Sequence, residues 1–483
     1  MSNKGAKFTL KVVTNKQKTK VLFAEADSQF VDVLLSFLTL PLGKIVKVLG
    51  SHYGDMCSAI GSLTTLYNGL VELDISNFEA EGGKLMLLDP VSPPAAKCRN
   101  LKLKINDYRA TRYFCCPDLS CVCSKKENMS LYWGIARCEC GKALTREVPL
   151  RSVKTSSERG NGGFVVSGST FVISDDLMIM PNTPSSVLKI LGNLGITADT
   201  DWDLKDVIIG YDEVMGLLRG LFLSGTPLTD IVLSNGQINL AIRAEPIIPP
   251  PKAEPRLSFY YYMYESIELK VIMQKSTNKL LFAEADEVFM EFVFGLLMIP
   301  LGEVGRLLDC KTFFTNVDNL YSSAKDLINS TYISDRESAI SSLVVPTVPH
   351  GYVSEKFFPL VDEEASKMYY YQGKGPRNDE FMSDSPFMGG SCLKVTDFKF
   401  DSLFKGPRIY MVNDDLCVTP ASSITSYLSN LGRLKIPLSD VTERVVHVGL
   451  EEAFGILKAS LVSKRALSCG LNHLLMKQTK QEN

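Results

Sequence analysis

One segment of this 483-residue chain occurs twice, and the repetition constrains the fold more than any other feature of the sequence. Leu10–Asp27 reads LKVVTNKQKTKVLFAEAD, and Leu269–Asp286 reads LKVIMQKSTNKLLFAEAD. The offset of 259 holds without a gap from Leu10 to Gly50, and 17 of those 41 positions are identical. A repeat of this length indicates that the chain is built from two copies of one structural unit.

Shorter matches continue in the same order further along the chain. Ser174–Pro181 (SDDLMIMP) matches Asn413–Pro420 (NDDLCVTP), and Ile209–Leu228 matches Val448–Leu467. The segment between the copies is rich in proline, which fixes φ and favours an extended, semi-rigid spacer. We therefore predict a first repeat unit over residues 7–243, a linker over 244–257 and a second repeat unit over 258–476.

Each unit is expected to combine strands with helices. Phe8–Thr14 and Thr19–Glu25 alternate and are rich in β-branched residues, so the polar turn between them predicts a β-hairpin. Asp27 precedes an apolar run and is placed to cap a helix, which the Pro-Leu-Gly at Pro41–Gly43 breaks. Helices also close the unit, for example over Asp212–Leu223. Because strands and helices do not alternate regularly, the pattern predicts an α+β fold with a small sheet in each repeat.

Several motifs together resemble a known family. The repeated LKV…KVLFAEAD hairpin, the Pro-Leu-Gly break, a cysteine-bearing middle and the ending EEAFGILKASLVSK (Glu451–Lys464) are similar to the plant-specific family called domain of unknown function 674. The resemblance covers about residues 7–243 and 264–476. It implies a plant protein with a tandem arrangement, and it brings no catalytic or binding residues to this chain.

A cysteine cluster is the strongest chemical signal. Seven of the 12 cysteines lie between Cys98 and Cys140, in a stretch that includes YFCCPDLSCVC and CECGK. Two short cysteine groups separated by 14 residues are typical of a tetrahedral thiolate site for zinc. We predict a zinc-ribbon-like insert at about residues 98–145, holding one structural zinc on Cys116, Cys121, Cys138 and Cys140, with Cys115 and Cys123 as alternates. The C-x-C spacing departs from the usual C-x-x-C, so free buried thiols or a redox pair remain the competing interpretation.

The second copy lacks this cluster. At the corresponding place it has MYYYQGKG (Met368–Gly375), with only Cys392 nearby. A metal site that is absent from one of the two copies is better explained by a structural role than by a catalytic one. Four thiolates also leave no open position for water or substrate.

Other polar groups have simpler structural explanations. The carboxylates Glu25 and Asp27, repeated as Glu284 and Asp286, suit acid–base catalysis, but Asp27 also suits a helix cap. Asp175–Asp176 fits a tight turn. The four histidines form no nucleophile–histidine pattern, and the glycine-containing stretches lack the spacing of phosphate loops. We predict no catalytic residue and no nucleotide cofactor.

Charge and hydropathy exclude further classes. The 52 Lys and Arg balance 54 Asp and Glu, so the basic surplus of a nucleic-acid-binding protein is missing. The most apolar runs, Phe30–Leu42 and Phe289–Leu301, are too short to cross a bilayer, and the N-terminus does not resemble a signal peptide. Cysteines without a secretory signal favour a reducing cytoplasmic or nuclear location.

Three functional hypotheses follow. The first is a non-enzymatic interaction or scaffold protein with protein partners, in which the first repeat carries a structural zinc. The second is an enzyme with a site shared between the repeats, using Glu25 and Asp27 or their equivalents. The third is a zinc-ribbon nucleic-acid binder, which the near-neutral charge disfavours.

Overall fold

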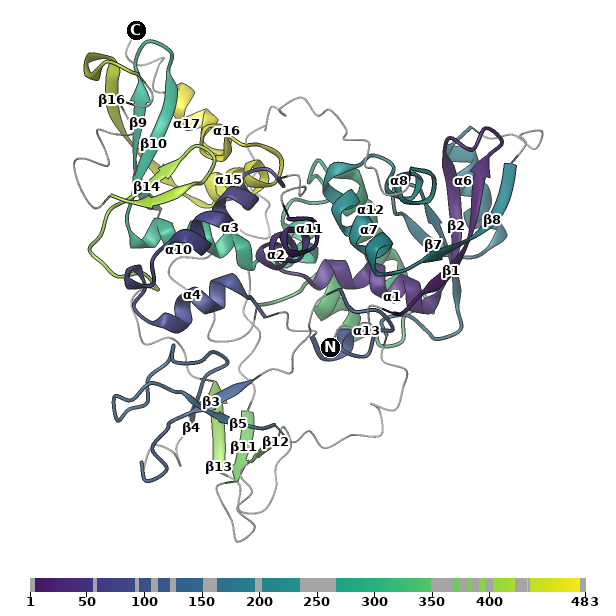
Figure 1. Cartoon of the computed structure of the whole chain (residues 1–483), viewed down its shortest axis with the longest axis horizontal. Helices are drawn as coiled ribbons and strands as arrows, with labels where there is room; N and C mark the ends of the chain where they lie inside the picture. Colours follow the sequence, from purple (N-terminus) through teal and green to yellow (C-terminus); the bar gives the residue numbers. More distant parts are fainter. Residues whose placement is uncertain are drawn as a thin grey trace.

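The computed structural model describes residues 5–54, 59–91, 95–105, 112–121, 127–150, 163–195, 202–234, 266–348, 368–372, 381–383, 391–395, 403–421, 432 and 435–477. The predicted linker at 244–257 lies outside these residues. Helices and strands both contribute substantially, which confirms the α+β prediction. Figure 1 shows two lobes, each containing a sheet, and a smaller module below them.

An antiparallel five-stranded sheet forms the first lobe, in the order β7-β6-β2-β1-β8. Its strands are β1 (Phe8–Asn15), β2 (Val21–Asp27), β6 (Thr170–Ser174), β7 (Ile179–Pro181) and β8 (Trp202–Ile209). The helices of this half are α1 (Ser28–Ser36), η1 (Phe37–Thr39), α2 (Leu42–Tyr53), α3 (Leu63–Glu72), η3 (Ile75–Asn77), α4 (Glu81–Leu88), α5 (Ala95–Cys98), α6 (Pro184–Asn193), α7 (Tyr211–Leu223) and α8 (Pro227–Leu233).

The second lobe has a five-stranded antiparallel sheet of the same order, β15-β14-β10-β9-β16. Its strands are β9 (Ile267–Gln274), β10 (Lys279–Ala285), β14 (Tyr410–Asn413), β15 (Val418–Pro420) and β16 (Val441–Val448). The helices of the second half of the chain are α10 (Glu287–Gly295), η7 (Leu296–Met298), α11 (Leu301–Leu307), α12 (Thr315–Ile328), α13 (Arg336–Ala339), η8 (Ile340–Val344), η9 (Leu438–Asp440), α15 (Leu450–Val462), α16 (Ala466–Gly470) and α17 (Asn472–Lys477).

Both predicted hairpins form, and both are followed by a capped helix. In the first sheet β1 pairs with β2 through Val12 and Ala24, and the apolar residues of β1 face the core. The carboxylate of Asp27 accepts the N–H of Phe30 at 2.8 Å, and Asp286 accepts that of Phe289 at 2.9 Å. Each carboxylate satisfies an N–H group that the first turn of a helix leaves without a partner. Asp27 therefore acts as a helix cap, which was the structural alternative to a role in acid–base catalysis.

The two halves meet at their Pro-Leu-Gly breaks. Pro41 and Pro300 pair as an isolated antiparallel β-bridge. The N–H of Leu42 donates to the carbonyl of Ile299, and the N–H of Leu301 donates to that of Leu40, both at 2.9 Å. Helices α2 and α11 begin at these residues and lie between the lobes in Figure 1. Large apolar side chains from both halves belong to one continuous buried cluster.

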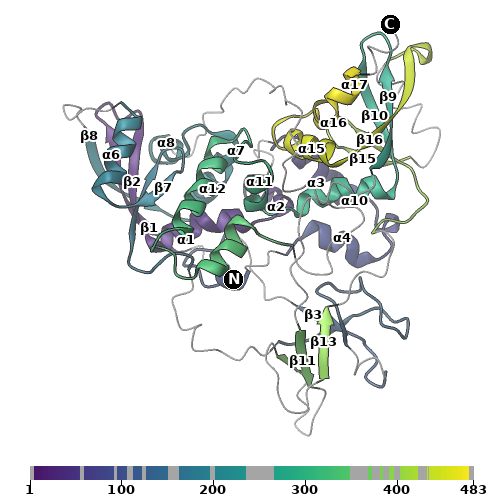
Figure 2. The same ribbon diagram turned by 180° about the vertical axis from the view of Figure 1, so that it is seen from behind.

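Each half also sends a helix to the other lobe. Helix α12 packs on α7 and β7 of the first lobe, and α3 packs on α10 and β15 of the second, as both Figure 1 and Figure 2 show. The side-chain amide of Asn316 in α12 donates to the carbonyl of Ser224 at 2.8 Å. The hydroxyl of Ser62, which precedes α3, donates to the carbonyl of Ser463 at 2.7 Å. The exchange makes the two lobes structurally interdependent.

A third region forms the small module. β3 (Tyr113–Cys115) pairs with β5 (Arg146–Val148) in a two-stranded sheet. A four-stranded sheet has the order β12-β11-β13-β4, with β4 (Glu127–Met129), β11 (Met368–Gln372), β12 (Phe381–Ser383) and β13 (Ser391–Val395). Because β4 pairs in parallel with β13, this sheet joins strands from the two halves of the chain.

Candidate metal centre

Strand β3 directs adjacent cysteines to opposite sides. Cys115 is buried with Tyr113, Met129 and Val148 in one small apolar cluster. Cys116 belongs to a different cluster, which also contains Cys138. Successive side chains of a strand point to opposite faces, and this alternation explains the separation. It excludes Cys115 from the group that Cys116 joins. Cys123, the other alternate, lies outside the described residues.

The turn after β3 brings Cys121 back toward Cys116. The N–H of Cys121 donates to the carbonyl of Asp118 at 3.2 Å. The carboxylate of Asp118 accepts the N–H of Ser120 at 2.9 Å and its hydroxyl at 2.6 Å. Aspartate stabilises such turns by accepting hydrogen bonds from the backbone two residues later. The sequence CPDLSC therefore folds into a compact loop with a sulfur at each end.

A second tight turn holds Cys138 and Cys140. The N–H of Cys138 donates to the carbonyl of Lys142, and the N–H of Gly141 donates to the carbonyl of Cys138, both at 2.8 Å. Gly141 has φ +84°, a conformation that only glycine adopts without steric cost. This glycine turn explains why a C-x-C spacing suffices, because the chain reverses directly after Cys140.

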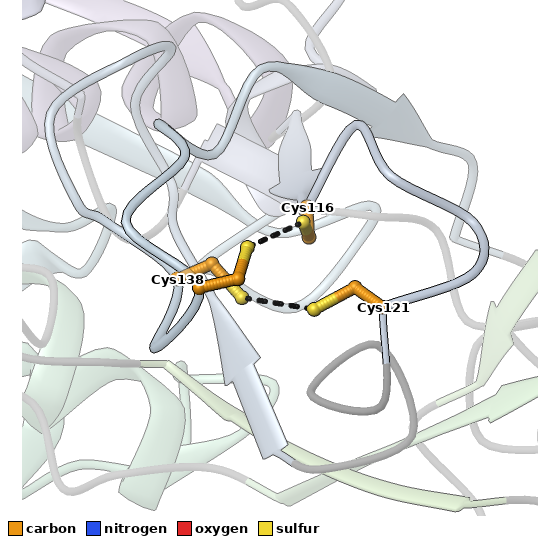
Figure 3. Close-up of side chains that lie close together, drawn as sticks. Cys116, Cys121 and Cys138 are labelled. Atoms are coloured by element: carbon orange, nitrogen blue, oxygen red, sulfur yellow. Dashed lines mark hydrogen bonds between the residues drawn. The ribbon is translucent and has the colours of Figure 1, made fainter.

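The two turns place four sulfur atoms together, as Figure 3 shows for three of the residues. The Sγ atoms of Cys116 and Cys140 lie 3.7 Å apart, and those of Cys121 and Cys138 lie 3.8 Å apart. All four sulfur atoms lie within 4.8 Å of one another. A tetrahedron with metal–sulfur bonds of about 2.3 Å has edges of about 3.8 Å. These four cysteines can therefore hold a metal ion.

Two cationic side chains hold the turns in place. The ammonium group of Lys142 contacts the carboxylate of Asp118 at 2.6 Å, joining the second turn to the first. This lysine, with the hydroxyl and N–H of Ser120, holds the pKa of Asp118 well below its usual range. The guanidinium of Arg146 on β5 donates to the carbonyl of Cys116 at 2.7 Å. The sulfur atoms are thus held by a network that also fixes the backbone around them.

The thiols differ in how readily they ionise. Burial raises the pKa of Cys116 to about 12. A backbone N–H from Lys142, followed by neighbouring thiols, lowers the pKa of the exposed Cys140 to about 7. A metal binds thiolates and displaces the protons. A site with such thiols therefore binds metal more strongly as the pH rises.

The other candidate residues remain separate from this centre. Glu25 lies 3.9 Å from Lys11 on the neighbouring strand, and Asp27 caps α1. Asp175 is more than a turn residue, because its carboxylate accepts the N–H and the hydroxyl of Thr229, each at 2.8 Å. His473 lies 2.7 Å from a carboxylate oxygen of Glu452. Among the described residues, the cysteine group is where metal-ligating side chains gather.

Sequence patterns did not reveal two buried acidic groups. Asp32 in α1 accepts the N–H groups of Phe164 and Val165 at 2.7 and 3.0 Å, and burial raises its pKa to about 6. Glu303 in α11 is almost fully buried and forms an ion pair with Arg306. The sequence carries no signal that Asp32 has partners over 130 residues away, and for Glu303, whose partner is only three residues along, it does not show the burial.

None of the described helices is long and apolar enough to span a membrane. Comparison with curated proteins and with solved structures gave no match. The model of one family, described as a protein of unknown function (DUF674), matches residues 4–451. That match covers most of the sequence, including both hairpins and all four clustered cysteines, and the chain therefore belongs to the DUF674 family.

Proposed function

We propose that this protein is a non-enzymatic interaction or scaffold protein whose first repeat carries one structural zinc ion. The observation that carries the proposal is the group of four cysteine sulfur atoms within 4.8 Å of one another. Four thiolates complete a tetrahedral zinc site and leave no coordination position for water or substrate. Soft thiolate ligands favour zinc over magnesium or calcium.

The small size of the surrounding core supports a structural role. Among the described residues, the cluster around the cysteines buries Phe114, Cys116, Ala136, Cys138 and Leu144. Burying one large apolar side chain contributes about 1.5–3 kcal/mol. Structural zinc contributes roughly 10–16 kcal/mol in zinc-finger peptides at neutral pH. Metal binding is thus the larger source of stability for the two cysteine-bearing turns of the zinc-ribbon-like insert at about 98–145.

The repeat architecture belongs to the same proposal. We infer two homologous units, over residues 7–243 and 258–476, connected by a linker over 244–257. The identical order of the two five-stranded sheets supports this division. In the second unit the corresponding stretch of sequence, Met368–Gly375, has no cysteine, so the metal would serve the first unit alone.

Structural roles of the acidic candidates weigh against the enzyme hypothesis that uses them. Asp27 and Asp286 cap helices, and Glu25 and Glu284 lie beside Lys11 and Lys270 respectively. A cytoplasmic or nuclear location forms part of the proposal, because a reducing compartment keeps thiols available for zinc.

Zinc content of the intact protein tests the proposal. We expect one zinc per chain after purification under reducing conditions, and loss of that zinc in the double variant Cys138→Ser, Cys140→Ser. Cys115→Ser is the matched control, because this neighbouring sulfur faces a different cluster. Unchanged zinc in the double variant would refute the site.

The interaction role needs its own test. Affinity capture with the intact chain should recover a partner in stoichiometric amount. A small-molecule turnover that Glu25→Gln abolishes would instead establish the enzyme hypothesis.

A further inference from the structure

The four clustered cysteines differ in their exposure to solvent. Cys116 and Cys138 are only 2% and 4% exposed, and Cys121 is half-buried. Cys140 is exposed, and so are its neighbours in the glycine turn, Glu139–Lys142. The oxidation of cysteine depends on solvent access as well as on thiolate character. A small oxidant in solution therefore reaches the sulfur atom of Cys140 before the other three.

Each close contact between sulfur atoms joins one turn to the other. The Sγ atom of Cys140 lies 3.7 Å from that of Cys116. The Sγ atoms of Cys121 and Cys138 lie 3.8 Å apart, and Figure 3 shows these two side chains facing each other. A disulfide bond is about 2.05 Å long, so an approach of less than about 2 Å converts either contact into a covalent bond. Cys115 cannot compete for this pairing, because its side chain is buried in a different cluster.

The two sulfur atoms of the first contact are held to different degrees. Cys116 directly follows β3, which is paired with β5, and its carbonyl accepts the guanidinium of Arg146 at 2.7 Å. Cys140 lies in the exposed turn, just before Gly141. The buried Cys116 is thus the fixed partner, and the exposed Cys140 is the partner that approaches it.

We propose that Cys140 is a site of oxidation by hydrogen peroxide, that it forms a disulfide with Cys116, and that the site then releases its metal. This inference rests on the metal centre of the proposed function. In the first step the thiolate of Cys140 attacks one peroxide oxygen, so that an S–O bond forms, the O–O bond breaks and hydroxide leaves. In the second step the thiolate of Cys116 attacks the oxidised sulfur, so that an S–S bond forms, the S–O bond breaks and a second hydroxide leaves. The two sulfur atoms lose two electrons, and the peroxide gains them.

The disulfide changes what holds the two turns together. It removes two of the four thiolates, and Cys121 and Cys138 alone do not complete a tetrahedral site, so zinc is lost. The new bond connects residues 24 positions apart and joins the same two turns that the metal joins. A cross-link of this kind restricts the unfolded chain. Oxidation therefore replaces the metal with a covalent bond, and the turns stay connected.

Peroxide treatment of the intact, zinc-loaded protein tests this inference. After removal of the reductant, one equivalent of hydrogen peroxide should release the zinc to a chromogenic chelator. Peptide mass spectrometry after alkylation should find Cys116 joined to Cys140. Zinc content before treatment tests the proposed function, whereas release and pairing test the inference. Protein stripped of metal by a chelator should form the same disulfide, so the pairing is tested even if the chain holds no zinc.

Two histidine variants separate the exposed thiol from the other ligands. Cys140→His keeps a zinc ligand but removes that thiol, so peroxide should release its zinc at least about tenfold more slowly. Cys121→His is the matched control, because it replaces a half-buried ligand and keeps the contact between Cys116 and Cys140. It should lose zinc as fast as the original chain. If it binds no zinc, it should still form the disulfide between Cys116 and Cys140.

Three outcomes would overturn the proposal. The first is zinc that stays bound to the original chain after peroxide treatment. The second is a first disulfide that does not include Cys140. The third is equal release of zinc from Cys140→His and Cys121→His.

Discussion

Pro41 and Pro300, which occupy the same position in the two copies of the repeated segment, pair with each other as an antiparallel β-bridge. Equivalent residues meet in this way only close to an approximate two-fold axis. The reciprocal hydrogen bonds from Leu42 to Ile299 and from Leu301 to Leu40 have the same length, as such an axis requires. The contact lies in the core, since Leu38, Leu40 and Leu297 are fully buried.

Close backbone packing at this contact predicts the effect of enlarging a glycine. A Cβ atom added at Gly302 would overlap the carbonyl oxygen of Leu343, whereas one added at Gly50 meets nothing within 4 Å. We expect Gly302→Ala to lower the free energy of unfolding by about 1–3 kcal/mol, because the packed backbone must shift. Gly50→Ala in helix α2 should instead raise it by roughly 0.5–1 kcal/mol. Urea unfolding measures both, and equal stability of the two variants would contradict the described packing.

The exchanged helices predict that the halves depend on each other. Fragments 1–243 and 258–483, prepared separately, would each lack the helix that covers part of its sheet. We expect each fragment alone to be unstable or to self-associate, and a mixture to form a folded heterodimer. Circular dichroism and light scattering of the fragments and their mixture measure this. Two stable monomeric fragments that do not bind each other would contradict the exchange.

Burial of Asp32 predicts a pH dependence of stability. Its pKa is raised from 3.8 to about 6, so the folded state favours the protonated carboxyl group. The contribution of protonated Asp32 to the free energy of unfolding is fully present below pH 3.8 and is lost as the pH rises through about 6. Asp32→Asn stays neutral, and its amide oxygen can accept the same N–H groups. Between pH 4 and 7 the variant should therefore gain up to about 3 kcal/mol relative to the original chain.

Chemical denaturation across this pH range checks the Asp32 prediction. A stability difference between Asp32→Asn and the original chain that stays constant from pH 4 to 7 would show that the carboxyl group keeps its ordinary pKa.

Metal removal should affect both halves of the chain in the small module. Cys116 follows β3, and the N–H of Phe114 in β3 donates to the carbonyl of Ser130 at 2.8 Å, directly after β4. Strand β4 in turn pairs with β13. Chelation of zinc should therefore speed amide hydrogen exchange in β3, β4, β5 and β13, while β1 and β9 keep their protection. Unchanged exchange in β13 would show that the metal does not support this pairing.

Local features of the fold could be predicted from the sequence. The hairpins, the helix caps at Asp27 and Asp286 and the breaks at Pro41 and Pro300 depend on residues close together in the chain. The four predicted cysteines come together because two short turns supply two sulfur atoms each. Thiolate ligands in such turns are a local pattern, and a glycine directly after Cys140 is typical of a point where the chain reverses direction.

Long-range relationships could not be predicted in the same way. The hydrogen bond from Ser62 to Ser463 spans most of the chain, and nothing in the sequence around these two buried serines distinguishes them from serines on the surface. Repetition predicts two similar units, but it does not say whether a helix packs on its own sheet or on that of the other copy. Both arrangements bury the same apolar face, so hydrophobic periodicity does not distinguish them.

X-ray absorption at the zinc edge of the intact protein tests the central claim most directly. A structural site on Cys116, Cys121, Cys138 and Cys140 predicts four sulfur neighbours at about 2.3 Å and no oxygen or nitrogen ligand. An oxygen or nitrogen neighbour at about 2.0 Å would contradict it, because a site with an exchangeable ligand is open to substrate.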